Sequence, residues 1–583
     1  MKGEDYLVAI GPLDRRLPLH GSLSAIGLTQ IVSTDMLSIY VSKTTTVTRL
    51  KSPSSGFVIG PIFQTGTTAA SKPALNGADA VAIIGSDGDL LLTRYWGAYV
   101  AILYNPKLDG ITLLREPSGA TGCYYIQEAG LVVAASSVAC LEGTGIWRGR
   151  LDADALGQHL VTPQLRSADT CLRDLTELLA GSAMTVTQGG AAVTERWRPW
   201  TFAGSRAAYS NPNDAASDLH RVVTDTIGSW AGHFGQILLS VSGGLDSSIV
   251  AAALHGAHRP FTCLTLATQA SSGDEREYAR CLCTALEVEL TEAFENPGLV
   301  DLSRSDAGGL PRPLARSFAQ SHDRIALRTA DAYGAKAHFM GGGGDNVFCY
   351  LQSSAPVVDR FLAEGFGVGL WRTAQDIGLL AEVSAIAVLR DGLRRINRGS
   401  RRYRWPLDLS FLSQDLRCRA ELPYHPWLDV PPDGLPGKAA HIAWLLTIQN
   451  HLEGYAREDV LPVVSPLMSQ TIIELCLRIP TWLWCEGGRN RAVARQAFRK
   501  QLPAEIVDRS TKGTPDSFVA ALFDSRRSEI RSLLLDGRLA ALGLLDLNAV
   551  AAVVNDRRPA HGEDYTRLMK LVDVETWSRC WAE

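Results

Sequence analysis

Seven consecutive residues, Ser242 to Ser248 (SGGLDSS), combine groups that can hold the phosphates of a nucleotide. The two glycines let the backbone turn sharply and bring N–H groups close to an anion. Hydroxyl groups can donate to phosphate oxygens, and a helix that begins here would add the positive end of its dipole. Phosphate repels a carboxylate, so Asp246 indicates a magnesium ion held between the two. The alternative is a tight strand-to-helix turn capped by Asp246. The sequence contains no GxxxxGK[ST] motif, which excludes an ordinary P-loop.

Alternating strands and helices are expected to position this segment. Apolar runs predict strands over residues 237–241, 261–267, 288–290 and 337–340. Helical spacing of apolar residues predicts helices over residues 245–254 and 274–286. This order is typical of a parallel sheet with helices on both faces. Ligands bind beyond the carboxyl ends of such strands, where SGGLDSS and a second glycine-rich run, Gly341 to Asp345, both fall.

The N-terminal part has a different pattern. Four segments predict an antiparallel, strand-rich domain: DLLLTRY, GAYVAILY, GITLLR and LVVAAS, between Asp89 and Ser136. Asp109–Gly110 is a plausible hairpin turn. A polar linker, GSRAAYSNPND, leads us to place one domain at residues 1–204 and a second at 205–583. Beyond Tyr350 the sequence is expected to be mainly helical.

Bulk composition narrows the function. The chain has 583 residues, too many for one compact core, with 46% hydrophobic and 20% charged residues and a net charge of -4. No general attraction for nucleic acid follows from that charge, and no apolar run is long enough to span a membrane. The eleven scattered cysteines form no CxxC pair, so we expect reduced, mostly buried thiols and no structural metal. A cytoplasmic enzyme is the simplest interpretation.

SGGLDSS after a buried strand resembles the pyrophosphate-binding loop of the ATP pyrophosphatases, specifically the asparagine-synthetase-like branch. Three more segments are similar to that family: Asp274–Glu275 with Tyr278–Ala279, Gly341 to Asp345, and Lys512 in DRSTKG. The resemblance implies that ATP and pyrophosphate contact Ser240, Ser242, Gly243, Gly244, Leu245, Asp246, Ser247, Ser248, Gly341 and Gly343. It implies Asp246 and Asp345 as Mg²⁺ ligands and Lys512 as the catalytic cation beside the α-phosphate.

The first half also resembles the glutamine amidotransferase domain of this family, an N-terminal-nucleophile fold. The residues that carry this likeness are Trp96 to Tyr99, Arg115 to Gly119 and Ala134 to Ser137. Such domains use a cysteine at the mature N-terminus, whereas residue 2 is Lys2 and the first cysteine is Cys123. We therefore expect a degenerate domain, with the attacking amine coming from the substrate itself.

Cyclising members of the group, β-lactam synthetases and lasso-peptide cyclases, take their amine in this way. Gly342 stands where asparagine synthetases have a glutamate, and Gly341 to Phe348, Pro466 to Gln470 and Gly487 to Arg491 look most like lasso-peptide cyclases. The resemblance then implies adenylation of an Asp or Glu side chain in a precursor peptide, followed by macrolactam closure on its N-terminal amine. A precursor peptide is the expected partner, with a leader peptidase and a leader-recognition protein, and without nucleic acid or membrane.

Several alternatives stay open. The nearest is a small-molecule amide synthetase of the asparagine or β-lactam type. A catalytically inactive peptide-binding scaffold and a tRNA-modifying pyrophosphatase are more distant. Seven arginines between Arg390 and Arg404 are either a solvated helix face or a docking patch for an acidic partner. The general base is not identified by any motif.

Overall fold

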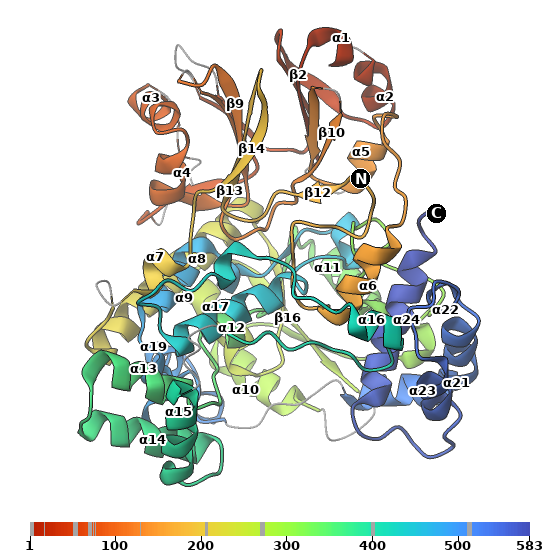
Figure 1. Cartoon of the computed structure of the whole chain (residues 1–583). Coiled ribbons are helices and arrows are strands. Elements are labelled where there is room, and N and C mark those ends of the chain that lie inside the picture. Colours follow the sequence, from red (N-terminus) through yellow and green to blue (C-terminus); the bar gives the residue numbers. More distant parts are fainter. Residues whose placement is uncertain are drawn as a thin grey trace.

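The computed structural model describes residues 5–16, 18–50, 56–67, 73, 75, 77–105, 107–128, 130–204, 208–268, 274–397, 403–509 and 516–582. Its fold is mixed α/β: antiparallel sheets in the N-terminal part, a parallel sheet in the C-terminal part, and added helices. The two antiparallel sheets stand together at the top of Figure 1, and the parallel sheet lies below them among helices. The predicted fold class is therefore confirmed.

Each antiparallel sheet has six strands. In order, the first contains β12 (Thr176–Glu177), β10 (Tyr124–Glu128), β11 (Leu131–Ala135), β1 (Tyr6–Ile10), β3 (Leu37–Val41) and β2 (Thr29–Ser33). The second contains β14 (Gly190–Glu195), β13 (Ser182–Thr187), β9 (Gly110–Arg115), β8 (Val100–Asn105), β5 (Gly56–Ile59) and β4 (Val47–Leu50). The predicted hairpin joins β8 to β9, where Asn105 pairs with Gly110 and Asp109 takes a positive φ of 44°.

Alternate side chains of these strands fill separate layers. In β1, Tyr6, Val8 and Ile10 enter the core between the two sheets, while Leu7 and Ala9 point to the opposite face. That opposite face packs against helices α2 (Leu19–Ala25), α5 (Val138–Glu142) and α6 (Ala153–Val161). A strand buried on both faces explains why β1 is apolar at all five positions.

One strand prediction is wrong. Residues 89–94 of the DLLLTRY segment form helix α4 (Asp89–Arg94), and only Tyr95 enters a strand, β7 (Tyr95–Gly97), which pairs with β6 (Ile62–Gln64). The three consecutive leucines suit a short buried helix as well as a strand, because so short a run does not distinguish the two periods. Leu91 and Leu92 are buried in the helix, and Gly88, in the left-handed region, precedes it.

The parallel sheet has the order β17 (Leu290–Phe294), β16 (Phe261–Ala267), β15 (Ile237–Ser240), β18 (Ala337–Phe339) and β19 (Val463–Val464). All four pairings are parallel, so the carboxyl ends of the strands share one edge. The predicted strands are confirmed, with the third beginning at Leu290 and extending past the predicted 288–290. Strand β19 was not predicted, and its residues come from far along the chain.

Helices cover both faces of this sheet, as predicted. Ile237 and Leu239 of β15 share a core with α8 (Pro212–Phe234) and α9 (Leu245–Gly256). Leu238, which points the other way, packs with Ala326 and Ala330 of α11 (Gln320–Tyr333). Helix α10 (Arg276–Ala285) contains the Cys281-Leu282-Cys283 run. The eleven cysteines are free thiols, eight of them buried.

Beyond Tyr350 the described chain is mainly helical, as predicted. The longer helices are α13 (Ala355–Glu364), α14 (Val368–Leu380), α15 (Ala385–Asn397), α17 (Pro436–Gln449), α18 (Gln470–Arg478), α21 (Asp516–Leu535), α23 (Leu547–Val554) and α24 (Asp564–Ser578). Helices α13 to α15 form a separate group at the lower left of Figure 1, and α21 to α24 lie on the right. Among the described residues, no helix is both long and apolar enough to cross a membrane.

A buried ion network joins the two parts of the chain. Glu177, in the edge strand β12 of the first sheet, pairs with Arg115, Arg166 and Arg312, and Arg166 also pairs with Glu453. Burial alone would raise the pKa of the Glu177 carboxyl, but the three guanidinium groups hold it well below its usual range. Helix α7 (Trp200–Ala203) leads toward α8 at the predicted domain boundary, residues 204/205, which remains a prediction.

Candidate functional site

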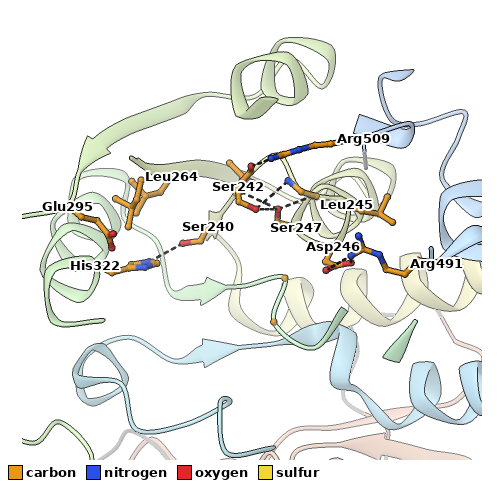
Figure 2. A pocket seen from close by; sticks show the side chains of 15 residues that line it. Ser240, Ser242, Leu245, Asp246, Ser247, Leu264, Glu295, His322, Arg491 and Arg509 are labelled. Atoms are coloured by element: carbon orange, nitrogen blue, oxygen red, sulfur yellow. Dashed lines mark hydrogen bonds and ion pairs between the residues drawn. The ribbon is translucent and has the colours of Figure 1, made fainter. Parts of the chain in front are cut away.

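A cavity of about 340 Å³ lies at the carboxyl ends of the parallel strands. Its lining residues come from the end of β15 and the SGGLDSS loop, from β16, from the residue after β17, from α11, from the second glycine run and from two later arginines. They are Ser240, Val241, Ser242, Gly244, Leu245, Asp246, Ser247, Leu264, Leu266, Glu295, His322, Gly341, Gly342, Arg491 and Arg509. Figure 2 shows Glu295 and His322 at one end, Asp246 and Arg491 at the other, and Ser242 with Ser247 between them.

The SGGLDSS loop bends back on itself before α9 begins. The Ser242 N–H donates to Ser247 Oγ at 3.3 Å, and the Gly244 N–H donates to Ser242 Oγ at 3.3 Å. These bonds are long, so they are weak and can be exchanged for stronger bonds to an anion. With the N-terminus of α9 beside them, these groups form a site suited to phosphate oxygens.

Close backbone packing makes two glycines necessary in the loops. Gly243 has φ 64°, and a Cβ atom added there would lie 2.3 Å from Tyr278 Cβ. A Cβ atom added at Gly341 would lie 2.6 Å from the backbone nitrogen of Ser247. The two glycine-rich loops therefore touch each other and α10 in a way that no other residue type permits.

Arg491 joins the two aspartates that were predicted to bind magnesium. Its Nη1 atom lies 2.9 and 3.0 Å from the carboxylate oxygens of Asp246 and 2.5 Å from Asp345 Oδ1. The Arg491 side chain is 9% exposed, and its guanidinium lies over the Tyr350 ring. Burial lowers the pKa of this guanidinium, but the two carboxylates more than offset that and raise it. The carboxylates thus converge on one point, which a protein cation occupies.

The donor set at that point fits a magnesium ion. Mg²⁺ in nucleotide sites is commonly bound by one or two carboxylates, with phosphates and water as its other ligands, and Asp246 with Asp345 supplies such a pair. The described residues contain no group of three or more His, Cys, Asp or Glu side chains that could hold a metal without such additional ligands. The guanidinium of Arg491 stands at the same point, so a metal ion there requires Arg491 to move.

Arg509 provides the second cation of the cavity. Its Nη2 atom donates to Glu275 at 2.5 Å, Nη1 donates to the Ser242 carbonyl at 3.4 Å, and the guanidinium lies 3.9 Å from the centre of the Tyr278 ring. Glu275 and Tyr278 belong to the DE..YA segment of the sequence. The segment therefore holds Arg509 against the SGGLDSS loop.

The other end of the cavity is less charged and suits a nucleoside. Leu264 and Leu266 offer apolar surface, and Ser240 Oγ hydrogen-bonds to His338 Nε2 at 2.7 Å and to His322 Nε2 at 3.3 Å. Burial, aided by the charge of Arg457, lowers the pKa of His322 to about 3, so its imidazole is neutral at physiological pH. Burial raises the pKa of the Glu295 carboxyl to about 7.

The structure brings most of the predicted site residues together. Ser240, Ser242, Gly244, Leu245, Asp246, Ser247 and Gly341 line the cavity. Ser248 is fully buried and its hydroxyl donates to the Gly244 carbonyl at 2.8 Å, while Gly343 packs against Met468. Lys512, the predicted catalytic residue, lies outside the described residues.

Four titratable residues of the cavity were not predicted. Arg491 and Arg509 lie in segments that resemble the family. No pattern of residue spacing, however, indicated that these two side chains reach the site. Glu295 and His322 carried no signal at all, because isolated titratable residues are far more often structural.

A comparison with family models supplies the assignment. The model described as asparagine synthase matches residues 234–579, more than half of the chain. The chain belongs to the asparagine synthase family. A comparison with curated proteins gives no match. The family match supports an ATP-dependent amide ligase.

Three solved structures show remote likenesses to this asparagine synthase family member. NMN synthetase from Francisella tularensis is 15% identical, with a TM-score of 0.18 over 24% of this chain and 60% of that one. The allosteric regulatory enzyme of purine biosynthesis is 10% identical, with a TM-score of 0.21 over 52% and 76%. Glutamine phosphoribosylpyrophosphate amidotransferase from B. subtilis is 9% identical, with a TM-score of 0.23 over 58% and 81%. These TM-scores are too low to say anything about the fold or activity of this chain.

Proposed function

We propose that this protein is an ATP-dependent peptide cyclase of the lasso-peptide type. It would activate an Asp or Glu side chain of a precursor peptide as an acyl-adenylate and join it to the N-terminal amine of the same peptide. AMP and pyrophosphate are the by-products. A leader peptidase and a leader-recognition protein are the proposed partners in preparing that peptide.

The cavity at the strand ends carries this proposal. In it the SGGLDSS loop, the second glycine run and two guanidinium groups face a common space large enough for a nucleotide. A carboxylate cannot expel oxide at neutral pH, so an amide-forming enzyme of this family needs the phosphate leaving group that such a site provides. The asparagine synthase match over residues 234–579 supports the same chemistry.

Two features favour an amine that belongs to the substrate. Burial raises the pKa of Cys123 to about 11 and that of Cys140 to about 12, so neither thiol is the activated nucleophile that releasing ammonia from glutamine requires. Gly342 lines the cavity where asparagine synthetases carry a glutamate, which removes one acid–base group from the site. If the amine belongs to the substrate peptide, the enzyme has to hold the two reacting ends of that peptide together and does not have to capture a free amine.

The chain's own residues would share the work as follows. The SGGLDSS backbone and Gly341 would bind phosphate oxygens, and the guanidinium groups of Arg491 and Arg509 would offset their charge. Asp246 and Asp345 would hold magnesium, which supplies further positive charge for the pyrophosphate. Lys512 is proposed to stabilise the charge that develops at the α-phosphate.

The decisive experiment measures products with a peptide substrate. The protein is incubated with ATP, Mg²⁺ and synthetic peptides that carry one internal Asp or Glu and a free N-terminus. We expect AMP, pyrophosphate and a peptide that has lost one water. The matched control is the same peptide with an acetylated N-terminus, which should form no cyclic product.

Two outcomes would replace the proposal. AMP formation that requires only a free amino acid or small diacid would assign a small-molecule amide synthetase. Failure to bind ATP at all, in a folded protein, would contradict both ligase assignments and favour a binding scaffold.

A further inference from the structure

The end of α14, the turn after it and the outer side of α15 carry an unusual set of exposed side chains. This α15 surface consists of Leu379, Val383, Ile386, Arg390, Leu393 and Arg394. We propose that the α15 surface docks an acidic amphipathic helix of a separate protein. The inference does not depend on the proposed cyclase activity.

Large apolar side chains are well exposed at this place. Leu379 is 69% exposed, Val383 48%, Ile386 54% and Leu393 58%. Single exposed apolar residues need no explanation, but four within fifteen positions of one helix-turn-helix segment indicate a surface that another molecule covers.

These side chains are additional to those that hold α15 in place. The buried side of α15 presents Val388 and Gly392 to α13, where a Cβ atom added at Gly392 would lie 3.5 Å from Val358. Ile386, Arg390 and Leu393 follow the i, i+4, i+7 spacing and so form a second stripe on the same helix. Packing within the chain buries Val388 and Gly392, whereas Ile386, Arg390 and Leu393 stay exposed to solvent.

The charges select an acidic partner. Within the described residues neither Arg390 nor Arg394 has an ion pair, although both are exposed. Asp391, the acid beside them, already accepts a hydrogen bond from Ser354. A partner helix that carries carboxylates one turn away from its apolar residues would match this arrangement. Its carboxylates would face Arg390, and its apolar residues would contact Ile386 and Leu393.

A membrane surface fits these residues less well. A helix that lies in a bilayer interface needs a broad apolar face, and α15 turns only Ile386 and Leu393 outward among its large apolar residues. Arg390 lies one turn from both of them, so the outward side of α15 is not a continuous apolar face.

The α15 surface also adjoins the segment that leads to the cavity. A Cβ atom added at Gly488 would lie 2.7 Å from the Leu379 side chain. The Asp376 carboxylate, one turn earlier on α14, accepts hydrogen bonds from the Gly487 and Gly488 backbone. A partner bound here would therefore rest beside the segment that carries Arg491.

Binding of a designed peptide tests the proposal on the full-length protein. The probe is a fluorescein-labelled helical peptide of about 15 residues, long enough to form helix, with Leu and Glu at helical spacing on one face. Fluorescence anisotropy should show saturable binding that weakens with added salt. Leu393→Ser and Arg390→Glu should each weaken it by about tenfold, as expected for interface apolar and charged groups. Arg148→Glu, an exposed arginine in the strand-rich part, is the matched control and should bind like wild type.

Charge reversal makes the test specific. A probe with Lys in place of Glu should bind Arg390→Glu/Arg394→Glu better than it binds wild type. Equal binding of the Glu probe to all variants, or none to wild type, would overturn the proposal. Preferential sedimentation with phosphatidylglycerol vesicles would assign the surface to lipid instead. A dimer in light scattering that Leu393→Ser abolishes would assign it to a second copy of the chain.

Discussion

Arg491 and a divalent metal ion are expected to exclude each other, and replacing the arginine should reveal this. The guanidinium Nη1 atom stands where the carboxylates of Asp246 and Asp345 converge, within 3.0 Å of both. Arg491→Gln removes the positive charge and keeps a polar side chain that can face the same space. In this variant the two carboxylates lose their shared cation, so the nucleotide-free protein should bind Mg²⁺ or Mn²⁺ more tightly.

The expected gain in metal affinity follows from the two ion pairs of Arg491 that the metal must replace. The side chains are 9% exposed for Arg491, 11% for Asp246 and 26% for Asp345, so the pairs are stronger than surface pairs but partly screened. About 1 to 1.5 kcal/mol per pair gives about 2 to 3 kcal/mol for both. Because 1.4 kcal/mol corresponds to a factor of ten, metal affinity should rise by about thirty- to one-hundred-fold.

Electron paramagnetic resonance of free Mn²⁺, titrated against protein without nucleotide, measures this affinity directly. Arg489→Gln is the matched control, because Arg489 lies two residues away and pairs with Asp508 instead. Adding Asp345→Asn to Arg491→Gln should remove most of the gained affinity. Calorimetry with ATP should show the opposite change, a weaker nucleotide site, if the guanidinium contacts phosphate.

An unchanged Mn²⁺ affinity in a folded Arg491→Gln protein would contradict this prediction. It would mean that the two aspartates form a structural ion network with Arg491 and do not hold a metal. Circular dichroism and a thermal melt establish that the variant is folded, so that loss of structure is not mistaken for loss of the site.

Three further substitutions test other parts of the site. Gly243→Ala should destabilise the protein by about 2 kcal/mol or more in thermal melts, because its Cβ would lie 2.3 Å from Tyr278, whereas Gly334→Ala, at a similar φ of 65° and with open space, should cost less. Lys512→Ala should abolish AMP formation in a folded protein, and retained turnover would show that the lysine has been assigned wrongly. Burial raises the pKa of Glu295 from 4.5 to about 7, so the folded protein holds this proton more tightly and loses stability as pH rises through that range. Glu295→Gln should therefore be about 1 to 2 kcal/mol more stable than wild type at pH 8 and unchanged at pH 4, as measured by urea unfolding.

The local pattern of apolar runs and glycines in the sequence was sufficient to predict the parallel sheet. The strand at Phe261–Ala267 has the predicted bounds, and Ile237–Ser240 and Leu245–Gly256 differ by one or two residues. Strands buried on both faces are continuous apolar runs, and the glycines after them mark sharp turns. Where the run was too short to show a period, at Asp89–Arg94, the same reasoning chose a strand and the chain forms a helix. Strand β19 has two residues, too few for any pattern to predict it.

The two aspartates of the site were predicted from the sequence, but its two arginines were not. Asp246 and Asp345 each follow a strand, and their adjacent glycines give a local reason to expect a phosphate or metal site. Arg491 and Arg509 reach the cavity from segments about 150 to 260 positions away, and the neighbours of each resemble those of any surface arginine. Only the folded chain shows which arginines are buried against carboxylates.

The position of Arg491 gives a physical reason why this site can stay folded without its ligands. Two carboxylates brought together beside a helix N-terminus would repel each other, and an uncompensated buried pair costs about 3 to 5 kcal/mol. Arg491 removes that cost with a cation that the chain supplies, and its left-handed φ of 53° shows that the backbone is bent to deliver it. Ion pairing between these side chains is reversible, so magnesium and phosphate would be able to replace it together: Asp246 and Asp345 would hold the metal, and the Arg491 guanidinium would bind phosphate oxygens. In that exchange no charge is left without a partner.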